Sequence, residues 1–284
     1  MASELNKSGR RAGRFDGLLI CTDLDGTLLR DDKTVSRENL EAIEHFTAEG
    51  GYFTFITGRM PFFVGDLPER VRINAPFGCI NGGGLYDARE DKYIWQKPIR
   101  DDVTELVRYI YDNVPGVGIQ VNCFDKLYFI TENEAMHWFR KITGVPNLVA
   151  TLDGVDEPIA KIVFGDLREE NLAIVKELLE SHPRHDEFDY IRSERTLYEI
   201  LPKGVGKGAV LPRLAEHLGI DMSRTIAFGD YDNDASMLSA AGLGVAVANA
   251  TENARAAADL VTVSNNEHAI AKIIYDIENG KINI

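Results

Sequence analysis

The sequence predicts an α/β fold, with a parallel-sheet core and a second, α+β domain inserted into it. Short apolar runs near residues 18–22, 52–56 and 225–228 end abruptly in polar or Gly-containing turns, which is typical of buried parallel strands. Between about residues 85 and 195, apolar and polar residues alternate instead, which indicates an antiparallel or mixed sheet with one wet face. The parallel pattern then returns, so we expect the alternating region to be an insertion; 284 residues agree with about two domains.

The first part of the core is predicted to be a strand–helix–strand series. Ser36 is a typical N-cap residue, and Leu40, Ile43 and Phe46 follow it at helical spacing until Gly50-Gly51 ends the helix. Strands are expected over residues 18–22, 52–56 and 77–80. Three consecutive strands of the series would then end in polar or Gly-rich loops.

The remaining elements follow the same reasoning. In the insertion we expect strands over residues 93–96, 117–122, 126–131, 159–164, 188–192 and 196–201, and helices over 102–113, 133–142 and 169–180. In the returning core we expect strands over 225–228, 243–247 and 260–263, and helices over 207–218, 235–241, 252–258 and 266–278. Pro212 lies inside the first of these helices, so a kink or a late start is expected there.

Composition narrows the class of protein. The net charge of −14 argues against non-specific nucleic-acid binding and against an anionic membrane partner. Cys21, Cys79 and Cys123 show neither metal spacing nor a disulfide framework, which fits a reducing cytoplasm. No run approaches the ~18 apolar residues of a membrane span. Residues 1–14 are basic without an apolar segment, so we expect a disordered tail there.

Two carboxylates end the first predicted strand. Asp23 and Asp25 lie two residues apart, so in extended chain both can face one reacting group. A divalent cation can keep one ionised while the other carries a proton. A calcium loop starting at Asp23 would need Gly at its sixth position and Glu at its twelfth, where Leu28 and Thr34 stand. A plain acidic turn stays open on these residues alone.

Further polar clusters lie at strand ends or helix starts, and together they form a chemically complete set. The clusters are Asp23/Asp25, Thr57-Gly58-Arg59, Lys207, and Asp230/Asn233/Asp234. Asp23, Asp230 and a backbone carbonyl can supply oxygen ligands for Mg²⁺. The Thr57 hydroxyl, the Gly58 amide and the Lys207 ammonium can hold phosphate oxygens. Asp23 can attack phosphorus, while Asp25 can protonate the leaving oxygen and then activate water.

The order of these motifs resembles the haloacid dehalogenase-like (HAD) hydrolases. The matching segments are DLDGTLL, TGR, KG and GDYDND. Three further segments are similar to the Cof-type sugar phosphatases: YEILPKGVGKG, Asn81-Gly82 followed by Leu85-Tyr86-Asp87, and the tail AGLGVAVANATENARAAADLVTVSNNEHAIAKII. The likeness covers residue 17 to about residue 278, with motif-level matching only in the core.

The resemblance implies a Rossmann-like core, residues 15–84 and 199–284, with a large cap domain, residues 85–198, inserted into it. It implies Mg²⁺ bound by Asp23, the Asp25 main-chain oxygen and Asp230, with Asn233 and Asp234 around the metal and phosphate. Asp234 is counted among the metal residues, and Arg59, Asn81 and Gly82 among those that bind phosphate or substrate. The family's lysine maps to Lys207, which directly precedes the Gly at the helix start; Lys203 is the alternative.

The chain departs from the family pattern in two places. Asn81-Gly82-Gly83-Gly84 is richer in Gly than the usual Asn-Gly-Ala, which could loosen the cap hinge or a substrate contact. Ala246 or Ala248, in the run Val245–Asn249, stands where the family often has Met, a packing change that should leave the chemistry intact.

The leading functional prediction is a cytoplasmic Mg²⁺-dependent phosphatase of a small phosphorylated metabolite, in particular a sugar phosphate. A phosphomutase with the same aspartyl-phosphate chemistry, and a non-catalytic binder that keeps the fold, are the alternatives. Arg59 can contact substrate or pair with an acid. Polar candidates for specificity in the cap are Asn122, Asp125, Lys126 and Arg192. Neither the substrate nor the oligomeric state can be predicted.

Overall fold

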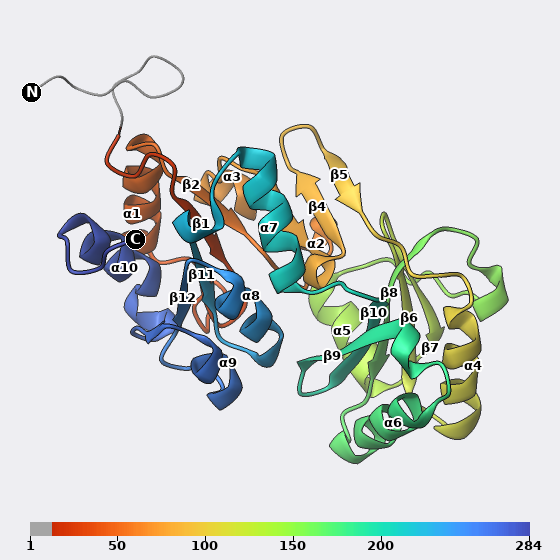
Figure 1. Ribbon diagram of the computed structural model, residues 1–284. Helices are drawn as coiled ribbons and strands as arrows, with labels where there is room; N and C mark the ends of the chain where they lie inside the picture. Colours follow the sequence, from red (N-terminus) through yellow and green to blue (C-terminus); the bar gives the residue numbers. More distant parts are fainter. Residues whose placement is uncertain (1–12) are drawn as a thin grey trace, which may run out of the picture. The chain divides into compact units, whose positions relative to one another are not determined.

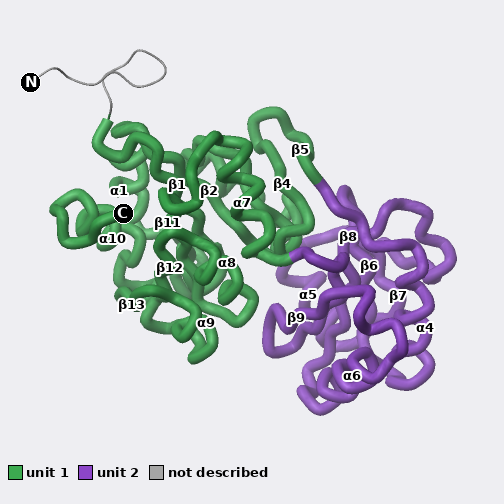
Figure 2. The backbone as a smooth tube through the Cα atoms, viewed as in Figure 1, with its two compact units in different colours: residues 1–95, 206–284 green, residues 96–205 purple. Residues whose placement is uncertain are grey.

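The computed structural model describes residues 13–284, which form two compact units (Figures 1 and 2). Within the described part, unit 1 comprises residues 13–95 and 206–284, and unit 2 comprises residues 96–205. The sequence prediction placed the boundaries at residues 84/85 and 198/199. In the structure, residues 85–95 belong to unit 1 and residues 199–205 to unit 2. A disordered tail was expected over residues 1–14, of which residues 1–12 lie outside the described part. Arg14 is described, and its amide donates to the Glu49 carboxylate.

Unit 1 is built on a five-stranded, wholly parallel sheet with the order β13-β12-β11-β1-β2. Its strands are β1 (Leu19–Thr22), β2 (Tyr52–Phe55), β11 (Thr225–Gly229), β12 (Leu243–Ala246) and β13 (Leu260–Val261). The β1 and β11 strands are buried along their whole length, as their continuous apolar runs predicted. The parallel core is therefore confirmed.

Helices cover both faces of this sheet, with α1 and α10 on one side and α7 and α8 on the other (Figure 1). They are α1 (Arg37–Ala48), α7 (Lys207–Leu218), α8 (Ala235–Ala240), α9 (Glu252–Ala257) and α10 (Ala269–Glu278). Ser36 caps α1 by accepting from the Asn39 amide, a contact that stabilises a helix by about 1 kcal/mol. Helix α7 begins at Lys207 with Pro212 inside it, so the late start that Pro212 suggested is wrong.

The third predicted strand does not continue the parallel sheet. Strand β3 (Phe77–Cys79) instead pairs antiparallel with β4 (Gly84–Asp87), in a separate sheet with the order β3-β4-β5 that also contains β5 (Lys92–Gln96). An isolated parallel bridge, Ile56 to Gly78, is the link to the end of β2. The tight turn that follows β3 folds the chain back on itself and makes the hairpin possible. Between β2 and β3 lie two short helices, α2 (Pro61–Val64) and α3 (Leu67–Val71).

Unit 2 contains a five-stranded antiparallel sheet with the order β7-β6-β8-β10-β9, as the alternating pattern predicted. Its strands are β6 (Gly118–Cys123), β7 (Leu127–Thr131), β8 (Ile159–Gly165), β9 (Phe188–Glu194) and β10 (Leu197–Pro202), and its helices are α4 (Val103–Asn113), α5 (Glu134–Thr143) and α6 (Glu169–Ser181). Apolar side chains of α4 and α6 form one core with alternate residues of β6, β8 and β10.

Candidate active site

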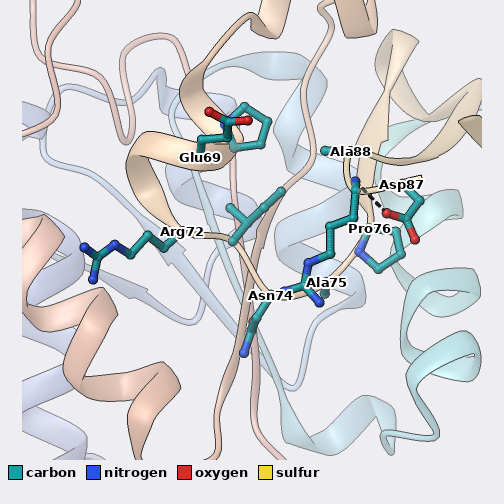
Figure 3. A pocket seen from close by; sticks show the side chains of 10 residues that line it. Glu69, Arg72, Asn74, Ala75, Pro76, Asp87 and Ala88 are labelled. Atoms are coloured by element: carbon teal, nitrogen blue, oxygen red, sulfur yellow. Dashed lines mark hydrogen bonds between the residues drawn. The ribbon is translucent and has the colours of Figure 1, made fainter. Parts of the chain in front are cut away.

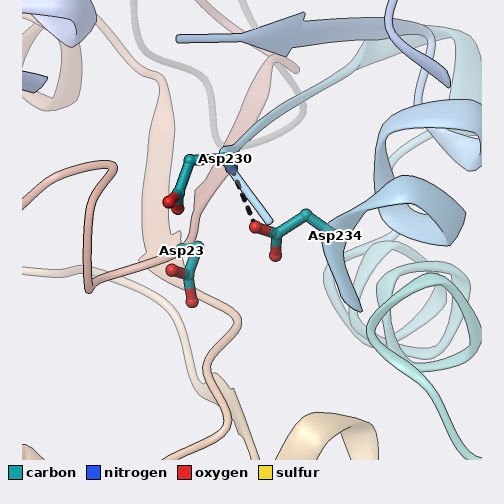
Figure 4. Close-up of side chains that lie close together, drawn as sticks. All are labelled: Asp23, Asp230 and Asp234. Carbon is teal, nitrogen blue, oxygen red and sulfur yellow. Dashed lines mark hydrogen bonds between the residues drawn. The ribbon is translucent and has the colours of Figure 1, made fainter. Parts of the chain in front are cut away.

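Asp23 and Asp230 follow two neighbouring strands of the parallel sheet. Thr22 of β1 lies opposite Phe228 of β11, and the Asp23 amide continues the ladder by donating to the Phe228 carbonyl oxygen at 2.9 Å. The carboxyl ends of parallel strands meet at one edge of a sheet, so the two side chains emerge together. Figure 4 shows both carboxylates with Asp234, from the loop after β11, beside them.

Lys207, the first residue of α7, is buried between two of these carboxylates. Its Nζ donates to Asp23 Oδ1 at 2.7 Å and to Asp234 Oδ1 at 2.6 Å. Burial alone would lower the lysine pKa, but the two carboxylates outweigh burial and raise it, so the ammonium stays charged. Lys203, the alternative lysine, is in unit 2 with its Nζ 3.0 Å from Asp189 Oδ1. The geometry therefore favours Lys207.

Asp234 closes the loop after β11. Its Oδ2 accepts from the Asp230 amide at 2.9 Å and from the Tyr231 amide at 3.0 Å, which fixes the 3₁₀ turn Asp232–Asp234. Gly229 leaves room for this arrangement, because a Cβ there would lie 2.4 Å from the Asp234 Cβ. Both oxygens of Asp234 thus have hydrogen-bond donors. By contrast, Asp23 and Asp230 each keep an Oδ2 without a donor among the described residues.

The three carboxylates fit a divalent cation. One oxygen from each of Asp23, Asp230 and Asp234 lies within 4.8 Å of the others. Burial, opposed by Lys207 and reinforced by the two other aspartates, holds the pKa of Asp23 well above its ordinary value. Burial also raises the pKa of Asp230 to about 6. Asp23 and Asp230, which each keep an oxygen without a donor, offer the carboxylate ligands that a hard cation such as Mg²⁺ prefers, and Asp234 lies beside them.

Two residues to which the sequence analysis assigned no role, Thr27 and Asn249, support this cluster. Thr27 Oγ1 donates to Asp230 Oδ1 at 2.7 Å, and Asn249 Nδ2 donates to the Gly26 carbonyl oxygen at 2.8 Å. Gly26 has φ of 80°, and a Cβ there would lie 2.4 Å from Asp230 Oδ2. Thr27 could have been found from its place in the DLDGT run, whereas no local signal pointed to Asn249.

Arg59 lies against Asp25. Its Nε donates to Asp25 Oδ2 at 2.8 Å and its Nη2 to Asp25 Oδ1 at 2.8 Å, while Lys33 Nζ donates to the same Oδ1 at 2.9 Å. Burial would raise the pKa of Asp25, but these cationic donors outweigh it, and the pKa is lowered. Of the two possibilities left open for Arg59, the structure displays the pairing with an acid. Lys33 was missed because nothing in its surroundings distinguished it.

The other predicted phosphate-binding residues come together near the end of β2. Thr57, only 1% exposed, accepts the Arg59 amide at its Oγ1 at 3.2 Å. Asn233 Nδ2 donates to Asn81 Oδ1 at 3.1 Å, and a Cβ on Gly58 would lie 2.9 Å from that same Oδ1. The predicted residues of unit 1 thus lie around one edge of its sheet, although they come from distant parts of the sequence.

Comparison with known proteins agrees with this arrangement. The sequence model of the haloacid dehalogenase-like hydrolases matches residues 20–274. The chain belongs to the haloacid dehalogenase-like hydrolase family. It is 30% identical to the 5-amino-6-(5-phospho-D-ribitylamino)uracil phosphatase YwtE of Bacillus subtilis, over 92% of this chain and 98% of YwtE. It is 29% identical to the phosphatase YwpJ of the same organism, over 90% of this chain and 98% of YwpJ.

Among solved structures, TM0651 from Thermotoga maritima is similar to this hydrolase with a TM-score of 0.78 and 28% identity. The match covers 94% of this chain and 98% of TM0651. The family predicted from the motifs is therefore confirmed. Family membership and the phosphatases among its relatives support an enzyme of the phosphoric monoester hydrolase class. No helix in the described part of this HAD-like hydrolase is long and apolar enough to cross a membrane.

Three of the four polar candidates for specificity have partners within unit 2. Asn122 Nδ2 donates to Gln120 Oε1 at 3.3 Å, Lys126 Nζ lies 2.5 Å from Glu157 Oε1, and Arg192 Nη2 donates to Glu169 Oε2 at 3.1 Å. These contacts account for the three side chains within the unit's own structure. The remaining candidate, Asp125, is exposed.

A cavity of about 450 Å³ in unit 1 of the hydrolase lies apart from the aspartates (Figure 3). Its lining residues are Pro68, Glu69, Arg72, Ile73, Asn74, Ala75, Pro76, Asp87, Ala88 and Arg89, and none of them belongs to the predicted site. Arg72, one of its two arginines, already pairs with Glu44. The mixed charges of the lining select no particular ligand.

Proposed function

We propose that this hydrolase is a Mg²⁺-dependent phosphatase that cleaves a small sugar phosphate or related phosphorylated metabolite through an aspartyl-phosphate on Asp23. The observation that supports it most is the cluster of Asp23, Asp230 and Asp234 around the buried Lys207. Unit 1 is assigned the catalytic role and unit 2 the role of the cap domain.

The cluster supplies the charges that phosphoryl transfer needs. Asp23, Asp230 and the main-chain oxygen of Asp25 would hold the cation, with Asp234 behind them. When bound, Mg²⁺ would place positive charge against the phosphoryl oxygens. Asp23 would hold the cation with one carboxylate oxygen and attack phosphorus with the other, while Lys207 donates to its Oδ1. Lys207, which is charged, would bring its ammonium to the same transferring group.

The end of β2 supplies neutral donors for the same phosphoryl group. The Thr57 hydroxyl and the Gly58 amide would donate to its oxygens, and Asn233 would approach from the loop after β11. An enzyme accelerates phosphoryl transfer mainly by positioning the reacting groups and by stabilising the negative charge on the phosphoryl oxygens in the transition state.

Asp25 is the proposed acid and base. It would protonate the leaving oxygen and then accept a proton from the water that hydrolyses the aspartyl-phosphate. Arg59 engages both oxygens of the Asp25 carboxylate. That pair must open, at least at one oxygen, before Asp25 can carry a proton. Arg59 would in this way hold Asp25 in the site between turnovers.

The substrate class rests on the relatives and on the chemistry of the site. YwtE is named for a substrate whose phosphate is carried on a ribityl chain, which is a sugar alcohol. The test is a phosphate-release screen of the purified chain with MgCl₂ over sugar phosphates, nucleotides and cofactor phosphates. We expect free phosphate from sugar phosphates without any added sugar bisphosphate. Release that requires a bisphosphate would indicate a phosphomutase, and no release from any ester would contradict the proposal.

A further inference from the structure

The turn Ile80–Gly82 has an unusual backbone. Ile80 and Asn81 are consecutive residues with positive φ, 56° and 52°, and both are fully buried. A β-branched residue with positive φ is a genuine outlier. Strained backbone of this kind persists only where the surroundings determine it, and it concentrates at functional sites.

The segment that holds this turn is the predicted phosphate-binding one. The Ile80 amide donates to the Arg59 carbonyl oxygen at 3.0 Å, and the Asn81 amide donates to the Thr57 carbonyl oxygen at 3.0 Å. Two backbone hydrogen bonds therefore join the strained turn to residues 57–59. A change in the turn would move that segment with it.

The Asn81 side chain extends the contact to two further groups. Its Oδ1 accepts from Asn233 Nδ2 at 3.1 Å and lies so close to Gly58 that a Cβ on Gly58 would be 2.9 Å away. Its neighbour Gly82 has φ of 92°, and a Cβ there would lie 2.2 Å from the carbonyl oxygen of Gly206, the residue before Lys207. One turn thus contacts all three segments that carry the phosphate-binding groups.

We propose that Asn81 is a positioning residue of the phosphoryl pocket, which sets the Gly58 amide and the Asn233 side chain, and that it is not a ligand of the substrate's leaving group. The inference rests on the proposed function and refines the sequence prediction that Asn81 binds phosphate or substrate. The carboxamide oxygen is engaged by Asn233, and the residue is fully buried, as expected of a support behind the binding groups. The left-handed turn is what brings the carboxamide there.

The decisive variant is Asn81→Gly, because glycine keeps the left-handed backbone and removes only the side chain. A positioning role predicts that KM for every ester and the Ki of orthovanadate rise by the same factor, about tenfold, as for one lost hydrogen bond. Orthovanadate has no leaving group, so it reports on the phosphoryl pocket alone. Melting temperature is measured for each variant.

Asn74→Ala is the matched control. Asn74 follows α3, and its side chain holds the start of β2. Its Nδ2 donates to the Gly51 carbonyl oxygen, and its Oδ1 accepts from the Phe53 amide. The control should lower the melting temperature and leave KM and Ki unchanged. Combining Asn81→Gly with Asn233→Ala should raise Ki by clearly less than the product of the single effects, because both variants break one contact.

The outcomes separate the inference from the proposed function. An effect of Asn81→Gly that varies between leaving groups, with Ki for orthovanadate unchanged, would make Asn81 a leaving-group ligand and overturn the inference. Unchanged KM and Ki would overturn it as well. If the wild-type chain hydrolyses no ester but binds orthovanadate, the proposed function fails, while the ratio of orthovanadate affinities still decides the role of Asn81.

Discussion

Each unit buries a lysine against carboxylates, and the two lysines have different surroundings. In unit 2, Lys161 of β8 donates to both oxygens of Glu199 of β10, each at 3.0 Å, across neighbouring antiparallel strands. In unit 1, Lys207 lies at a helix start beside a sheet edge, with Asp23 and Asp234 as partners and Asp230 within reach. Lys161 thus pairs with the carboxylate of Glu199, whereas Lys207 lies among three carboxylates.

A buried lysine with one carboxylate and a buried lysine among three differ in what they need for stability. A buried pair of one cation and one carboxylate can often be replaced by apolar residues at little cost. A buried excess of negative charge is costly unless protons or a cation offset it. Burial, together with Asp234 and Asp230, raises the pKa of Asp23 despite the opposing charge of Lys207, which agrees with this cost. The imbalance, more than the burial of a lysine, therefore supports the proposal that unit 1 carries the active site.

The largest expected effect comes from removing the attacking group. Asp23→Asn should lower kcat by about four orders of magnitude or more, as for other enzymes that lose a nucleophile. It should not lower the melting temperature, because one of the crowded carboxylates becomes neutral while the side-chain shape is kept. Phosphate release and thermal unfolding measure the two quantities. A variant with near wild-type turnover would remove Asp23 from the nucleophile role.

Removing the cation should come next in size. Chelation with EDTA should abolish phosphate release, and MgCl₂ should restore it. Mg²⁺ at 100 times its Kd should stabilise the wild-type fold by about 2.7 kcal/mol. Asp230→Asn should remove most of this stabilisation, whereas paired Lys161→Met and Glu199→Met replacements in unit 2 should keep it. Equal stabilisation of all these proteins would place the cation somewhere other than the aspartate cluster.

The sequence predicted the positions of strands and helices better than it predicted which strands pair. The strand pattern was correct in both units because burial of one face or two leaves a direct trace in the order of apolar residues. The pairing of β3 was missed, since the turn at Ile80 depends on contacts with Thr57 and Arg59, which are distant in sequence. The motifs identified residues that lie together at one sheet edge. Asn249 and Lys33 were missed, because their contacts with Gly26 and Asp25 are visible only in three dimensions.

Breaking the ion pair of unit 2 should change stability and leave turnover intact. Lys161→Met alone should lower the free energy of unfolding by about 3–5 kcal/mol, because Glu199 is left buried without its cation. Adding Glu199→Met should recover most of that loss. Urea unfolding of the single and double variants measures both. A double variant no more stable than the single one would mean that the loss does not come from leaving Glu199 without its cation.

The smallest effect tests the pair that links Arg59 to Asp25. Arg59→Lys keeps the charge but loses the fork that engages both oxygens, so kcat should fall roughly tenfold for esters with poor leaving groups. Esters with good leaving groups need little protonation and should be hydrolysed at nearly the wild-type rate. Stopped-flow or steady-state rates over a series of aryl phosphates give the comparison. A loss that is equal for all leaving groups would mean that Arg59 acts on the phosphate itself, and the pairing with Asp25 would then be secondary.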